Sequence, residues 1–142
     1  METQHLHRGR LLDHIQLVVQ DLSASRAFYS AIFAVLKVPL GGEGGDYFWY
    51  DELFVSSADS RAAQGKLTGR HHLAFQAADR PMVDAFYEAA LRAGGKDNGA
   101  PGERPYHPGY YAAFVLDPDG NNIEAVFHGA ARRSAPSVTI TF

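Results

Sequence analysis

Two stretches of this chain are similar to each other and together decide its fold: HIQLVVQDLSASRAFYSA at residues 14–31 and HLAFQAADRPMVDAFYEA at residues 72–89. Offset by 58 positions, they agree without a gap at six of eighteen residues, including the first histidine and a Phe-Tyr pair. Chance would give about one identity, since few residue types exceed a tenth of an average composition. We therefore interpret the chain as two copies of one structural unit.

Each copy predicts a strand, then a helix, then further short strands. Residues 11–19 alternate, so that apolar residues share one face while His14 and Gln16 share the other with a valine, and His72 begins a similar strand. Strands are also expected at residues 47–50 and 52–56 in the first copy, and at 110–116 and 122–128 in the second. The pattern predicts an α+β fold of two tandem βαβββ modules.

The chain has the length of one ordinary domain. We expect this domain at residues 10–129, with a first module at about 10–57, a polar linker at 58–69 and a second module at about 70–129. Residues 1–9 and 130–142 are expected to be terminal extensions.

The composition excludes several classes of function. The 13 basic and 16 acidic residues are nearly balanced, so we expect no nucleic-acid partner and no membrane partner. The N-terminus lacks a signal peptide and the longest apolar run, residues 31–36, is too short to span a bilayer, so we expect a cytoplasmic protein. With no cysteine, any metal must be held by imidazole and carboxylate groups.

Three candidate metal ligands lie on equivalent strand faces. Alternation in residues 122–128 puts Glu124 on the face away from the helix, as it does His14 and His72. Two imidazoles and one carboxylate can hold a divalent metal and leave coordination positions open for substrate. A single histidine on a strand is more often a hydrogen-bonded structural residue, so the hypothesis depends on all three together.

The choice between two adjacent histidines also depends on alternation. His71 should point away from His72, which makes His72 the ligand, although a bulge at Gly69 and Arg70 would reverse the choice.

The motifs LDHI at residues 12–15, HLAF at 72–75 and HPGYYAAFVLDPDGNNIE at 107–124 resemble the vicinal oxygen chelate superfamily. This superfamily includes glyoxalase I, bleomycin-resistance proteins, fosfomycin-resistance enzymes and extradiol dioxygenases, and the resemblance covers roughly residues 10–129. It implies an open, curled mixed sheet around a cleft with the helices outside, and a homodimer. It also implies that His14, His72 and Glu124 hold one divalent ion, which could be Fe, Mn, Zn, Ni or Co.

One position departs from the glyoxalase I pattern, which has a fourth ligand on the last strand of the first module. The aligned residue is Phe54, which cannot bind a metal. Glu52 lies two strand positions earlier, about 6.6 Å away, so it would serve only in a different register. The three-ligand pattern is more similar to the dioxygenase and fosfomycin-resistance branches, which argues against lactoylglutathione lyase activity.

Other residues are candidates for the cleft around the metal. The irregular segment that contains Arg104, Tyr106 and Tyr110 is expected to form one wall, with His107 and Tyr111 as candidate catalytic residues. The alternative is a Pro-Gly turn whose tyrosines pack at a dimer interface. Candidate residues lining the substrate pocket are Gln16, Trp49 and Phe54.

Two functions remain open from the sequence. The first is a metal-dependent enzyme that acts on a small substrate through its neighbouring oxygen atoms, by dioxygenase, lyase or isomerase, or transferase chemistry. The second is a metal-free small-molecule or drug-binding protein of the bleomycin-resistance type.

Overall fold

The computed structural model describes residues 5–8, 11–60, 63, 65–132 and 137–141. It divides into two compact units: unit 1 takes residues 1–22, 39–68 and 132–142, and unit 2 takes residues 23–38 and 69–131. Parts of the predicted linker (61–62 and 64) and of the predicted terminal extensions (1–4, 9, 133–136 and 142) lie outside the described residues.

Unit 1 contains a four-stranded mixed sheet in the order β2-β5-β4-β3. The strands are β2 (Ile15–Val19), β3 (Gly42–Glu43), β4 (Tyr47–Tyr50) and β5 (Leu53–Ser57). β2 and β5 run parallel, whereas β4 is antiparallel to β5 and to β3. Leu17, Phe48 and Val55 are fully buried, so one face of this sheet forms the core of the unit.

Part of the glycine-rich segment at residues 41–45 forms a short strand. Gly42 belongs to β3 and pairs with Trp49 on β4. A Cβ atom at Gly42 would lie 2.1 Å from Cη2 of the Trp49 indole, so only glycine lets the backbone approach the ring this closely.

Unit 2 contains a second mixed sheet in the order β6-β10-β9-β7, with β8 also paired to β9. The strands are β6 (His72–Gln76), β7 (Lys96–Asp97), β8 (Gly102–Glu103), β9 (Tyr111–Leu116) and β10 (Asn122–Phe127). Its first and last long strands, β6 and β10, are parallel neighbours, as β2 and β5 are in unit 1. This shared order confirms the predicted α+β fold of two βαβββ modules.

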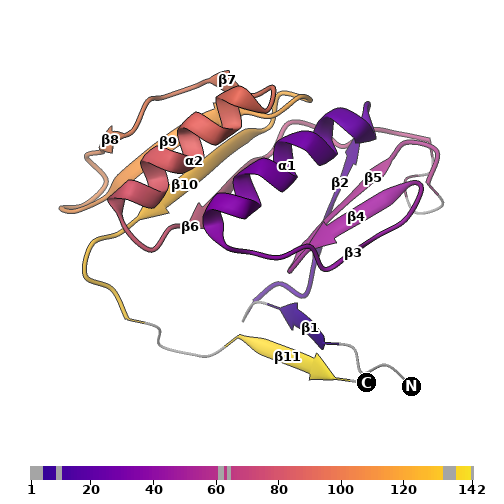
Figure 1. Cartoon of the computed structure of the whole chain (residues 1–142), viewed down its shortest axis with the longest axis horizontal. Coiled ribbons are helices and arrows are strands. Elements are labelled where there is room, and N and C mark those ends of the chain that lie inside the picture. The colour runs from indigo at the N-terminus through magenta and orange to yellow at the C-terminus, as the bar shows by residue number, and fades with distance from the viewer. Residues whose placement is uncertain (1–4, 9–10, 61–62, 64, 133–136, 142) are drawn as a thin grey trace. The chain divides into compact units, whose positions relative to one another are not determined.

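Both helices pack in unit 2. Helix α2 (Arg80–Arg92) is capped by Asp79, which accepts a hydrogen bond of 2.9 Å from the backbone N–H of Met82. It covers β9 and β10 (Figure 1). Its side chains Val83 and Phe86 are fully buried. Helix α1 (Leu22–Leu36) follows β2 in the chain but belongs to unit 2 from residue 23 onward, where Phe33 contacts Phe75 on β6.

A turn that begins and ends at the buried residues Asp117 and Asn121 joins β9 to β10. Asp117 accepts hydrogen bonds from the side-chain amide of Asn121 and from the backbone N–H groups of Asp119 and Asn121. Gly120 adopts φ +84°, which glycine tolerates without strain, as the Asp-Pro-Asp-Gly sequence predicts. The turn fixes the register in which Glu124 on β10 lies opposite Phe114 on β9.

The two ends of the chain pair with each other. β1 (His5–Arg8) and β11 (Val138–Thr141) form an antiparallel two-stranded sheet. Within the described residues, no helix is both long enough and apolar enough to cross a bilayer.

Candidate metal-binding face

The predicted ligands His72 and Glu124 lie together on neighbouring strands of unit 2. β6 and β10 are parallel, and His72 is opposite Asn122, two residues before Glu124. The Nε2 atom of His72 lies 3.1 Å from Oε1 of Glu124. Both side chains project from the face of the sheet opposite α2, which we call the Glu124 face.

One hydrogen bond orients the ring of His72. Its Nδ1 atom lies 2.9 Å from the carbonyl oxygen of Asn122. A carbonyl oxygen only accepts, so we assign the proton to Nδ1, which leaves Nε2 directed at the carboxylate. A metal-binding histidine is commonly held in this way, by a carbonyl that fixes both its tautomer and its orientation.

Glu124 is an unusual side chain for the interior, because it is only 2% exposed. The structure gives it two polar partners, the hydroxyl of Tyr110 and the imidazole of His72, and within the described residues no lysine or arginine pairs with it. A buried carboxylate is costly without a compensating positive charge. The donor set therefore fits a divalent cation bound between Nε2 of His72 and the carboxylate of Glu124.

Tyr110 donates a hydrogen bond to Oε2 of Glu124. Burial, followed by the hydrogen bond to Glu124 and its charge, raises the pKa of Tyr110 to about 12. The phenol therefore keeps its proton at physiological pH and holds one oxygen of the carboxylate in place. The sequence placed Tyr110 in the cleft wall but did not predict this role.

The predicted catalytic residue His107 lies at one end of the Glu124 face in a cluster of rings. Its Nδ1 donates to the carbonyl oxygen of Pro108 at 2.8 Å, and its Nε2 lies 2.9 Å from Nδ1 of His128. The ring of Tyr110 packs edge-to-face with both imidazoles, with ring centroids 5.3 Å and 5.2 Å away. Tyr110 is thus the link between this histidine pair and Glu124.

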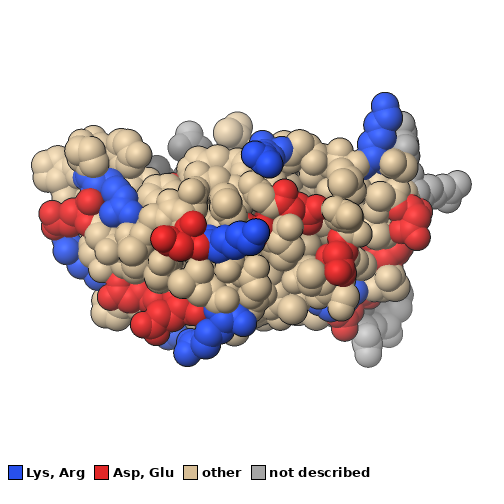
Figure 2. All heavy atoms as spheres, turned by 90° about the horizontal axis from the view of Figure 1, so that it is seen from above, with Lys and Arg blue, Asp and Glu red and all other residues tan. Residues whose placement is uncertain are grey.

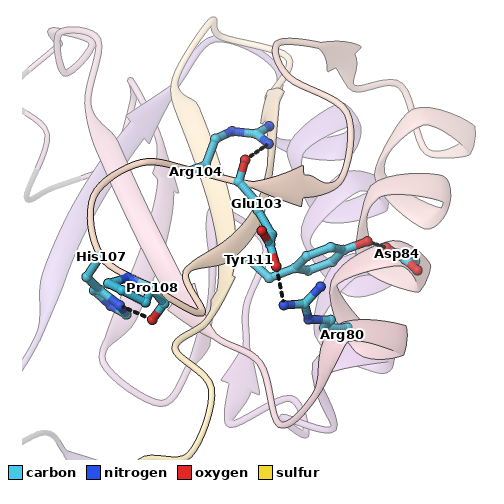
Figure 3. A network of polar contacts seen from close by, with 7 residues as sticks. All are labelled: Arg80, Asp84, Glu103, Arg104, His107, Pro108 and Tyr111. Atoms are coloured by element: carbon cyan, nitrogen blue, oxygen red, sulfur yellow. Dashed lines mark hydrogen bonds and ion pairs between the residues drawn. The ribbon is translucent and has the colours of Figure 1, made fainter.

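The structure does not bring the predicted catalytic residue Tyr111 to the Glu124 face. Adjacent strand residues point to opposite faces, and the hydroxyl of Tyr111 donates to Asp84 on α2 at 2.6 Å. Figure 3 shows this contact beside Arg80, whose guanidinium lies 4.7 Å from the centroid of the Tyr111 ring and pairs with Glu103. Tyr111 therefore fastens β9 to the helix.

The third predicted ligand, His14, lies in unit 1, immediately before β2. Its imidazole is exposed, and Nδ1 lies 2.6 Å from Oδ1 of Asp13. Within the described residues, the structure contains no cluster of three or more His, Asp or Glu side chains able to hold one metal ion.

The three predicted pocket residues lie together on the less buried face of the unit 1 sheet. Phe54 is opposite both Gln16 on β2 and Trp49 on β4. The rings of Trp49 and Phe54 are nearly parallel, 12° apart, and Tyr47 stacks on both. Gln16 donates a hydrogen bond of 2.8 Å to the hydroxyl of Ser56.

The strand registers relate Phe54 to Glu124. Phe54 is opposite Gln16 in unit 1, and Glu124 is opposite Ala74 in unit 2, while Gln16 and Ala74 are equivalent in the repeat. An aromatic ring thus occupies in unit 1 the position that a carboxylate occupies in unit 2.

Comparisons with known proteins identify the family of the chain. The sequence profile of the Glyoxalase/Bleomycin resistance protein/Dioxygenase superfamily matches residues 11–125. The chain belongs to this superfamily. Membership confirms the resemblance found in the sequence motifs. No protein among the curated sequences matches the chain.

Solved structures of the superfamily have the same fold. A glyoxalase/bleomycin resistance protein from Albidiferax ferrireducens has a TM-score of 0.68 and 27% identity, over 82% of this chain and 97% of its own. A glyoxalase-related enzyme from Fulvimarina pelagi has a TM-score of 0.68 and 20% identity, over 89% and 99% of the two chains. A lactoylglutathione lyase from Agrobacterium tumefaciens has a TM-score of 0.59 and 19% identity, over 82% and 92%. At such identities the last two establish the fold alone.

The surface charge of this superfamily member is mixed. On the face seen in Figure 2, acidic and basic side chains are interspersed among uncharged residues, and neither sign forms a broad continuous field. This distribution agrees with the formal charge of −3.

Proposed function

We propose that this protein is a divalent-metal-dependent enzyme that acts on a small substrate through neighbouring oxygen atoms of that substrate. The observation that supports the proposal is the approach of Nε2 of His72 to the buried carboxylate of Glu124, 3.1 Å apart. These two residues would hold the ion. His14 is proposed as a third ligand from the sequence repeat alone, in which it is equivalent to His72. When bound, a divalent ion supplies Lewis acidity toward substrate oxygens.

Neighbouring residues hold the side chains of His72 and Glu124 in place. The carbonyl oxygen of Asn122 holds the His72 ring, and Tyr110 holds one carboxylate oxygen of Glu124. The Phe114 ring stacks on the imidazole of His72, with centroids 6.1 Å apart. A ligand pair that is oriented before binding loses less conformational freedom when it binds.

Metal content tests the proposal most directly. Protein purified without chelators or metal-affinity resin, then reconstituted anaerobically with Fe, Mn, Ni, Co or Zn, should bind a stoichiometric ion. His72→Ala and Glu124→Gln should each weaken binding at least about a hundredfold, because each removes a direct ligand. His71→Ala is the matched control, because it removes an imidazole next to the proposed ligand His72 and should leave metal binding unchanged. Absence of stoichiometric metal, or equal affinity in His72→Ala, would refute the proposal.

The type of reaction needs a separate screen. Metal-loaded protein should be tested for oxygen uptake with vicinal diols and for glutathione-dependent conversion of 2-oxoaldehydes. Because Phe54 occupies the position equivalent to Glu124, we propose a three-ligand site and expect no lactoylglutathione lyase activity. We further propose a cytoplasmic homodimer, which light scattering on purified protein and cell fractionation would check.

A second function is favoured by the aromatic side chains in unit 1. Tyr47, Trp49 and Phe54 offer nearly parallel rings that are not fully buried, a surface on which a planar ligand stacks. In this alternative the protein sequesters a ligand without metal. Titration of Trp49 fluorescence in the presence of a chelator separates the two functions, because binding should survive metal removal only in a sequestering protein.

A further inference from the structure

The guanidinium of Arg104 is a positive charge held by the backbone. Its Nη2 donates to the carbonyl oxygen of Ala100 at 2.7 Å and its Nη1 to that of Glu103 at 3.3 Å. Of its five N–H bonds, three remain without a partner among the described residues, and no described carboxylate forms an ion pair with it. Arg104 is therefore fixed in position while its charge is unpaired.

The surrounding backbone leaves room for this head group. A Cβ atom at Gly99 would lie 3.3 Å from Nη2, and one at Gly102 would lie 3.0 Å from Nη1. Side chains at these positions would crowd the guanidinium. The adjacent carboxylate of Glu103 is not available, because it turns the other way and pairs with Arg80 at 2.7 Å (Figure 3).

Arg104 is connected to the candidate metal site through one aromatic ring. Its guanidinium carbon lies 5.4 Å from the centroid of Phe114, and the imidazole of His72 stacks on the same ring at 6.1 Å. Phe114 is opposite Glu124 in the sheet, so its side chain belongs to the Glu124 face. The cation and the imidazole of His72 thus contact the same aromatic ring on the Glu124 face.

We infer that Arg104 binds a carboxylate of the substrate. The substrate class is then a small acid with vicinal oxygens at one end, a carboxylate at the other, and an apolar middle that contacts Phe114. A planar guanidinium with free N–H bonds matches a carboxylate in a bidentate arrangement, and its fixed position lowers the entropic cost of binding. The vicinal-oxygen end rests on the proposed function, whereas the carboxylate end depends on Arg104 alone.

The carboxylate site is tested first in metal-free protein, which separates it from the metal hypothesis. Benzoate and its neutral analogue benzamide are titrated in the presence of chelator while the arginine Nε–H resonances are followed by NMR. One arginine resonance, absent from Arg104→Gln, should shift with benzoate and not with benzamide. Arg104→Gln should weaken benzoate binding about tenfold, as expected for loss of a charged bidentate contact.

Two further variants control this test. Arg92→Gln removes the same charge from the exposed end of α2 and should bind benzoate like wild type. Arg104→Lys keeps the positive charge but lacks the planar guanidinium that binds a carboxylate through two N–H groups, so it should bind benzoate with intermediate affinity. Equal binding of benzoate by wild type and Arg104→Gln, or equal binding of benzoate and benzamide by wild type, would overturn the inference.

A second measurement tests whether the metal and Arg104 bind the two ends of the same molecule. Metal-loaded protein is titrated with catechol and with 3,4-dihydroxybenzoate, which share a vicinal diol and differ by the carboxylate. Wild type should prefer the acid about tenfold, and Arg104→Gln should lose the preference while it still binds catechol. If no metal binds, the proposed function fails but the benzoate titration still decides on Arg104. If metal and catechol bind without preference for the acid, only the inference on Arg104 fails.

Discussion

The hydroxyl of Tyr29 on α1 donates a hydrogen bond of 2.6 Å to Oδ2 of Asp117, which lies 88 positions later in the chain. Tyr29 is fully buried, and Asp117 is 4% exposed in the turn between β9 and β10. The bond connects the helix of the first repeat to the turn that sets the register of Glu124. It links the stability of unit 2 to the geometry of the candidate site.

Substitution of Tyr29 by phenylalanine should measure this link. We expect Tyr29→Phe to lower the free energy of unfolding by about 2 kcal/mol, the usual cost of removing a buried hydrogen bond to a charged group. Urea titration followed by circular dichroism measures the change. Tyr87→Phe is the matched control: its hydroxyl bonds Asp97 at the surface, so its loss should change the stability little. Equal effects of the two substitutions would contradict the prediction.

Stability should fall in alkali. Burial, with the charge of Asp117 second, raises the pKa of Tyr29 well above its ordinary value of 10.0. The folded state then holds the Tyr29 proton more tightly than the unfolded state does. The stabilisation that this proton gives to the folded state is complete below pH 10 and decreases as the pH rises further. For one such group, the free energy of unfolding falls by up to about 1.4 kcal/mol per pH unit. Unfolding measured at pH 9, 10 and 11 should show a flatter profile for Tyr29→Phe; an unchanged profile would contradict this account.

Substitution of two adjacent tyrosines should affect metal affinity differently. Tyr110→Phe removes the donor to Glu124, and we expect metal affinity to fall about tenfold or more, as is typical when a group that orients a ligand is lost. Tyr111→Phe breaks the bond to Asp84 and should leave metal affinity unchanged. Calorimetric titration with Zn²⁺ or Mn²⁺ measures both. A larger loss in Tyr111→Phe than in Tyr110→Phe would reverse the assignment of the two side chains.

A glycine pair tests the aromatic face of unit 1. In Gly42→Ala the new methyl group would overlap the indole of Trp49, at 2.1 Å from Cη2, whereas at Gly45 a Cβ would meet nothing within 4 Å. We expect Gly42→Ala to lower the free energy of unfolding by about 1–3 kcal/mol, the cost of overpacking, and to shift the fluorescence of Trp49. Gly45→Ala should do neither. Unchanged emission in Gly42→Ala would mean that the glycine backbone does not cover the indole.

The local sequence was sufficient to predict the elements near the candidate site and the strand faces of the two candidate ligands His72 and Glu124. Alternation along two strands placed His72 and Glu124 on equivalent faces, and in the structure they meet at 3.1 Å. In the structure Phe114 lies opposite Glu124. Alternation from Phe114 puts Tyr110, and not Tyr111, on the same face as Glu124, but this inference needs the register. That register depends on the turn at Asp117, whose hydrogen bonds the sequence does not reveal.

What the sequence by itself determined is local and periodic: the two repeats, the capped helix at Asp79, the Asp-Pro-Asp-Gly turn and the absence of cysteine ligands. Tertiary structure decided which partners these elements meet. It placed α1 in unit 2, formed β3 from a glycine-rich segment, directed Tyr110 to Glu124 and left the charge of Arg104 unpaired. The physical reason is that periodicity fixes the face of a side chain. Strand order, register and packing fix its neighbours, and these depend on residues far apart in the chain.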